Sequence, residues 1–294
     1  MIYIENMENI LHRNLWLVLL LAIASSSLAQ QNSFLRFVEG AGDWQGTLET
    51  SITSYENGAG QRVDLIAAIH IADTDYYDAL NSYFDLLDIV LYELVADDNE
   101  VPAPSTDNSS LSGIGLLQSA VARFLDLEFQ LNGIDYQKNN LVRADLSAQQ
   151  LSEIMASKDE SFFSMFLKMA MAQMAAEQNA IANQHIQPST LTMMSLLTAL
   201  SSDDQAGALK YLLAQELGRS GDLAMSPELE SQLTILGDRN TVALKALEDA
   251  LESGIEHAGL FYGAAHMAGM ERELLQELGF SRVSTDWYVA WEIP

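Results

Sequence analysis

The chain has 294 residues, of which 49% are apolar and 19% charged, so it has enough apolar material for a globular core and is not wholly disordered. Its 41 acidic and 14 basic residues give a formal charge of −27, which disfavours nucleic acids and anionic lipid surfaces as partners and makes a salty habitat or cation binding plausible. It has no cysteine, which excludes disulfides, thiolate nucleophiles and Cys-ligated metal sites.

In chain order, the first predicted element is a signal peptide over residues 1–29. The apolar run 15–24 is shorter than the roughly 20 residues that a transmembrane helix needs. Ser27 and Ala29 are the small side chains that typically precede a cleavage site. We therefore expect an exported protein, periplasmic or secreted, with no stable membrane anchor. The sequence leaves open whether translation starts at Met1 or Met7.

An α/β pattern follows. Residues 44–52 alternate, 56–60 form a turn cluster, and 62–69 are nearly all apolar, which predicts a hairpin whose second strand is buried on both faces. Helical spacing begins after Asp73, and a second buried strand is predicted over 88–95. Strand, helix and strand within about 35 residues predict a parallel crossover unit.

The next segment, about 113–253, has a helical pattern and is predicted to be a long helical insertion. Its methionines favour flexible core packing over a metal-trafficking surface. Further helices are expected over 207–218, 238–251 and 271–278, with strands over 261–264 and 283–293. The prediction is one α/β domain over 30–294, with a mixed, largely parallel central sheet.

Two histidines occupy positions typical of a ligand site. His70 and His266 each follow an apolar, strand-like run and precede a helix, which in an open α/β sheet is the crevice at the carboxyl ends of the strands. Their surroundings also align without gaps, residues 66–72 on 262–268. His185 and His257 lie near helix ends, where a solvated or capping role is expected.

Glu93 interrupts an apolar strand, where a carboxylate is costly unless it is paired, protonated or bound to a metal. A water-exposed head group or a buried arginine partner is an equally open interpretation. We expect His70 and Glu93 to end adjacent parallel strands, which would place them close enough to share an ion. With His266 they would then form a divalent-metal site that activates water.

Two further residues have alternative interpretations. Arg239 opens a predicted helix, where it could clamp a substrate carboxylate or stabilise an oxyanion, although a surface ion pair is the commoner role. Asp73 could donate a proton at the site or cap the helix that follows it.

Four sequence blocks resemble one known family. They are Ala67-Ala68-Ile69-His70, Leu91-Tyr92-Glu93-Leu94, Arg239-Asn240, and Gly263-Ala264-Ala265-His266 followed by Gly269, Leu274 and Leu275. In order and spacing they resemble the TraB/GumN/TIKI family over residues 63–95 and 239–280. Ala67 stands where the family has glycine, which is tolerable if the backbone there keeps a negative φ.

The resemblance implies a fold similar to erythromycin-esterase and ChaN-like proteins. For animal members it implies metal-dependent proteolysis of secreted peptides with manganese or cobalt. It places His70, Glu93, Arg239 and His266 in the catalytic site, with His70, Glu93 and His266 as metal ligands. Arg239, Asn240 and Gly263 would contact the substrate.

The sequence therefore predicts an exported metal-dependent hydrolase, specifically a peptidase, that acts on a peptide or small molecule with Mn, Co, Zn or Fe. One alternative is a binding protein of the same fold that sequesters a peptide or other ligand without cleaving it. Another is that the four polar residues form a structural cluster with no ligand.

Overall fold

The computed structural model describes residues 33–96, 125, 127–160, 168, 171, 178, 182, 192–221, 230 and 233–294. The predicted signal peptide, His185 and most of the methionine-rich segment lie outside these ranges, so the predictions made for them stay predictions. No helix in the described ranges has both the length and the hydropathy that crossing a bilayer requires.

The described chain alternates strands and helices. It begins with β1 (Leu35–Glu39), β2 (Gly46–Asn57), β3 (Arg62–Ala68), β4 (Ile71–Ala72), α2 (Thr74–Phe84) and β5 (Ile89–Tyr92). It continues with β6 (Glu128–Phe129), α4 (Gln130–Gly133), β7 (Leu141–Arg143), α5 (Ala148–Ser157), α7 (Met193–Leu200) and α8 (Gln205–Gly221). It ends with the π-helical turn η3 (Thr234–Asp238), α10 (Arg239–Glu252), β8 (His257–Gly263), α11 (Ala264–Gln276) and β9 (Phe280–Ile293).

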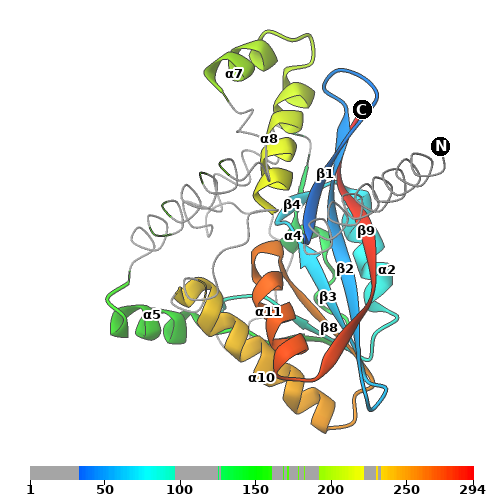
Figure 1. Ribbon diagram of the computed structural model, residues 1–294, viewed down its shortest axis with the longest axis vertical. Coiled ribbons are helices and arrows are strands. Elements are labelled where there is room, and N and C mark those ends of the chain that lie inside the picture. Colours follow the sequence, from blue (N-terminus) through cyan, green and yellow to red (C-terminus); the bar gives the residue numbers. More distant parts are fainter. Residues whose placement is uncertain are drawn as a thin grey trace, which may run out of the picture. The chain divides into compact units, whose positions relative to one another are not determined.

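One mixed sheet organises residues 34–294 (Figure 1). Its order within the described residues is β1-β2-β3-β8-β5-β7, and β9 pairs with β2. Strands β3, β8, β5 and β7 run parallel to one another, whereas β1, β2 and β9 form an antiparallel ribbon. The predicted α/β fold with a mixed, largely parallel central sheet is confirmed.

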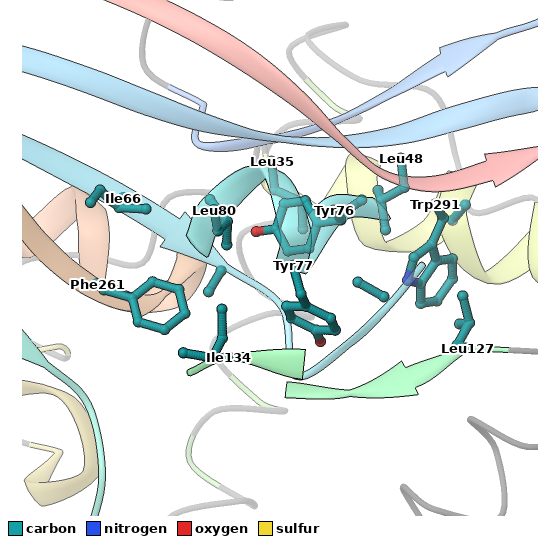
Figure 2. Close-up of a cluster of buried hydrophobic side chains, with 14 of the residues drawn as sticks. Leu35, Leu48, Ile66, Tyr76, Tyr77, Leu80, Leu127, Ile134, Phe261 and Trp291 are labelled. Carbon is teal, nitrogen blue, oxygen red and sulfur yellow. The ribbon is translucent and has the colours of Figure 1, made fainter. Parts of the chain in front are cut away.

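Helices cover both faces of the sheet because successive side chains of a strand point to opposite sides. Ile66 of β3 packs in the cluster that contains the buried face of α2, whereas Leu65 packs with α10 and α11. Figure 2 shows the first cluster, where Tyr76, Tyr77 and Leu80 of α2 lie among strand side chains. Each large apolar side chain buried in this way contributes about 1.5–3 kcal/mol, so packing on both faces fixes the strand order.

Local sequence explains the predicted hairpin turn. The side-chain oxygen of Asn57 accepts hydrogen bonds from the backbone N–H groups of Ala59 and Gln61, and Gly60 has a φ of +82°. Glycine adopts this conformation without steric cost. The expectation for Ala67 is also met: it lies inside β3 and is not among the residues with positive φ.

Three details of the predicted sheet are wrong. Strands β3 and β5 are not adjacent, because β8 pairs with both. The strand predicted to reach residue 95 ends at Tyr92, so Glu93 follows it instead of interrupting it. The segment predicted to be helical contributes β7 to the main sheet and β6 to a small sheet with β4. These two strands have three and two residues, which is too short for periodicity to indicate them.

Candidate functional site

The carboxyl ends of the four parallel strands meet at one edge of the sheet, and each is followed closely by a polar residue. His70 follows β3, Glu93 follows β5, Asp145 follows β7, and His266 lies in the first turn of α11 directly after β8. The register aligns these ends, since Tyr92 pairs with both Phe261 and Arg143. This edge is where open α/β sheets bind ligands.

The carboxylate of Glu93 lies at the centre of the polar cluster. Its Oε1 accepts a hydrogen bond from Nη2 of Arg239 at 2.8 Å and lies 3.5 Å from Nε2 of His266. Its Oε2 accepts one from the backbone N–H of Gly263 at 2.6 Å, and 11% of the side chain is exposed. Burial alone would raise the pKa of Glu93, but His266, Arg239 and His70 together hold this pKa well below its usual range. Glu93 is therefore a buried carboxylate that stays anionic.

Arg239 joins two carboxylates. It is the first residue of α10, as predicted, and only 7% of it is exposed, so the surface ion-pair interpretation is wrong. Its Nε and Nη2 donate to the two oxygens of Asp145 at 2.9 and 2.5 Å, and Nη2 also donates to Glu93. Burial would lower the pKa of Arg239, but Asp145 and Glu93 outweigh it and raise the pKa. The guanidinium thus holds Glu93 in place.

His266 is 3% exposed, and the direction of one amide fixes its protonation. Nδ2 of Asn240 donates to Oε1 of Glu230 at 3.0 Å, and Oε2 of Glu230 accepts from Arg272 at 3.1 Å. The other atom of this amide, Oδ1, lies 2.6 Å from Nδ1 of His266 and must be the acceptor. His266 therefore carries its proton on Nδ1, and Nε2 is the nitrogen that faces Glu93.

His70 is exposed and has an equivalent partner. Its Nδ1 lies 3.2 Å from Oε1 of Gln130, whose Nε2 donates to the hydroxyl of Tyr136 at 3.0 Å. In this orientation of the amide its oxygen faces Nδ1 of His70, which favours a proton on Nδ1. The pairing of β4 with β6 brings Gln130 to this position, and its backbone N–H donates to the carbonyl of His70 at 2.8 Å.

The structure thus brings most of the predicted residues together. Arg239 and His266 both contact Glu93, Asn240 holds His266, and the backbone of Gly263 holds Glu93. His70 lies at the same edge but forms no ion pair with Glu93, because β8 separates the two strands that they follow.

Three members of the cluster were not predicted. They are Asp145, Glu230 and Gln130, each of them buried. Asp145 comes two residues after a three-residue strand, a position that gives no periodic signal.

The imidazole and carboxylate groups at this edge are of the kind that bind divalent cations. Nε2 of His266 lies 3.5 Å from a carboxylate oxygen of Glu93, a separation that suits either a protonated imidazole paired with the carboxylate or a cation between two acceptors. Two protein ligands of one tetrahedral ion lie about 3.4 Å apart. Glu93, Asp145 and Glu230 also outnumber the two guanidinium groups that pair with them. Within the described ranges, however, no three His, Asp or Glu side chains lie close enough together to hold an ion.

Two other predicted roles are wrong. Asp73 occupies the N-cap position of α2, but its side chain makes no capping bond. It pairs instead with Lys210 at 2.8 Å and accepts the backbone N–H of Glu292 at 2.5 Å. His257 is partly buried and begins β8 instead of capping a helix, and its Nε2 lies 2.5 Å from the buried carboxylate of Asp64.

A surface hollow of about 290 Å³ lies between the first two strands and the C-terminal residues. It shares no residue with the polar cluster, and its charged lining residues are Glu39 and Glu292. Since the hollow contains none of the paired ionisable groups described above, the strand-end cluster remains the candidate site.

Comparisons with protein-family models, curated proteins and solved structures gave no match to this chain. The TraB/GumN/TIKI resemblance therefore stays a prediction that rests on the four sequence blocks and on their meeting at one edge of the sheet.

Proposed function

We propose that this chain is an exported metal-dependent hydrolase with peptidase activity, in which His70, Glu93 and His266 hold a divalent cation. The observation that carries the proposal is the buried pairing of an imidazole with a carboxylate, with Nε2 of His266 and Oε1 of Glu93 3.5 Å apart. Imidazole and carboxylate ligands without sulfur suit Mn, Co, Fe or Zn. Bound there, such an ion would lower the pKa of a water molecule and polarise a carbonyl group.

The chain's own residues would prepare this site in three ways. Glu93 stays anionic because Arg239 and His266 lower its pKa. Arg239 and the backbone of Gly263 fix the direction of the Glu93 carboxylate. His70 is exposed at the strand edge, where a substrate can reach it. The role proposed for Arg239 and Gly263 is therefore to position Glu93 rather than to bind the substrate.

The test combines metal analysis with hydrolysis of a peptide library by the protein over residues 30–294. We expect stoichiometric binding of one divalent metal and metal-dependent cleavage. His70→Ala, Glu93→Gln and His266→Ala should lower cleavage to background while circular dichroism shows a folded protein. Glu252→Gln is the matched control, because it makes the same acid-to-amide change at an exposed position on α10.

Two results would contradict the proposal. Tight ligand binding without turnover in any metal would indicate the sequestering protein instead. Failure of the wild-type protein to bind any divalent metal, combined with loss of stability in all three variants, would indicate a structural polar cluster.

A further inference from the structure

Two carboxamides, one beside each histidine, have no place in the function proposed above. Gln130 and Asn240 are both buried, come from different elements, and lie 3.2 and 2.6 Å from Nδ1 of His70 and His266. In each case the amide nitrogen is already committed, to Tyr136 and to Glu230. The same arrangement therefore occurs twice at one sheet edge.

We propose that Gln130 and Asn240 are positioning residues that select the Nδ1–H tautomer of His70 and of His266, leaving Nε2 of each imidazole as the basic nitrogen. An amide can turn over and offer either a donor or an acceptor to a neighbour. Here the second hydrogen bond removes that freedom, because a turned Asn240 would place its oxygen against the carboxylate of Glu230. The contact of Gln130 with Tyr136 has the same orientation but is a weaker constraint, because a tyrosine hydroxyl can also donate to an amide oxygen.

The charge of the group that accepts a hydrogen bond from Nδ1 matters as well as its position. A carboxylate beside Nδ1 would favour the charged imidazolium, whereas a neutral amide oxygen orients the ring without adding charge. A metal-binding or general-base histidine needs a neutral ring with a free lone pair. Nδ1–H is also the minor neutral form of free histidine in water, so finding it at both positions requires specific partners. A catalytic role for Nε2 of these histidines rests on the proposed function. The selection of the Nδ1–H tautomer does not depend on it.

The test is nuclear magnetic resonance of metal-free protein labelled with ¹⁵N-histidine at about pH 8, where an ordinary histidine is neutral. We expect His70 and His266 to show a protonated Nδ1 and an unprotonated Nε2. In Asn240→Leu, His266 should change to a mixture of tautomers while His70 is unchanged, and Gln130→Met should do the reverse. Gln130→Glu, which keeps an acceptor oxygen, should retain the Nδ1–H form of His70.

A matched control is Gln61→Met, because Gln61 donates to the carbonyls of Leu251 and Ile255, outside the cluster. It should alter neither tautomer. A protonated Nε2 on either histidine of the wild-type protein would overturn the proposal, even if Asn240→Leu does not fold. Unchanged tautomers in both amide variants would also overturn it.

Measuring metal binding tests the positioning role of the two amides separately from the proposed hydrolase function. Removing a hydrogen-bond partner of a metal-binding histidine typically weakens the metal about 10–100-fold, and we expect Mn²⁺ to bind Asn240→Leu more weakly by this factor. If His70 and His266 of the wild-type protein are both in the Nδ1–H form but the protein binds no metal, the hydrolase proposal fails and the positioning role of the two amides is supported.

Discussion

At the scale of single residues, a substitution at Gly269 tests how tightly Glu230 and Asn240 pack beside His266. A Cβ atom at this position would lie 1.5 Å from Oε1 of Glu230 and 2.7 Å from Nδ2 of Asn240. Replacing a helix-interior glycine by alanine ordinarily stabilises a protein by about 0.5–1 kcal/mol. In Gly269→Ala the overlap should reverse this sign and destabilise the protein by about 1–3 kcal/mol, with weaker binding of Mn²⁺. Urea unfolding and metal titration measure the two effects.

The control for this prediction is Gly58→Ala. No atom lies within 4 Å of a Cβ at Gly58, and its φ is not in the left-handed region. We expect its stability to change by less than about 0.5 kcal/mol. A stabilised Gly269→Ala with unchanged metal affinity would show that Glu230 does not need its observed position.

Residue types explain which members of the cluster the sequence could predict. Glu93 and His266 were recognisable because a polar side chain beside an apolar run is unusual. Asp145 and Glu230 were not, since they are two of 41 acidic residues and acidic residues are ordinarily exposed. Asp145 and Glu230 are buried because they pair with Arg239 and Arg272, which are 94 and 42 residues away from them in the sequence. No local pattern contains that information.

At the scale of elements, the hairpin, the crossover helix and the final strand follow from periodicity, but the order of the parallel strands does not. β8 comes from far along the chain and lies between β3 and β5. Any of these apolar strands could pair with any other, and packing of both sheet faces decides the order. For this reason only one of the two histidines predicted to meet Glu93 forms an ion pair with it in the structure: His266 does and His70 does not.

The contact between α5 and η3 gives a prediction at the element scale. Glu160, just after α5, accepts hydrogen bonds from the hydroxyl of Thr234 at 2.7 Å and from Lys168 at 3.0 Å. Burial would raise its pKa, but these bonds outweigh burial and lower the pKa from its ordinary value of 4.5. A carboxyl whose folded-state pKa is lowered contributes stability above its unfolded-state pKa and loses it as the pH falls through the folded value.

We therefore expect Glu160→Gln to lower Tm at pH 7, and the difference from wild type to shrink as the pH falls below about 4.5. Glu153→Gln, on the exposed face of α5, is the control and should show little difference at any pH. Thermal unfolding followed across this pH range measures both variants. A constant difference between wild type and Glu160→Gln would mean that the ionised carboxylate is not what joins the two elements.

At the scale of the whole molecule, a formal charge of −27 and a cluster with excess carboxylates both favour cations, but they do so differently. General self-repulsion is relieved by any salt, because screening shortens the range of each charge. A specific site responds only to an ion that it binds. We expect Tm to rise between about 0.01 M and 0.5 M NaCl in wild type and in Glu93→Gln alike.

Millimolar MnCl₂ at constant ionic strength should then raise the Tm of the wild-type protein further. Binding to the folded state alone adds about 2.7 kcal/mol when the free ion is present at 100 times its Kd. Glu93→Gln should lose this second increase and keep the first, because it removes one ligand and leaves almost all of the surface charge. Equal responses to MnCl₂ in the two proteins would mean that manganese acts through the surface carboxylates, and that the strand-end cluster holds no ion.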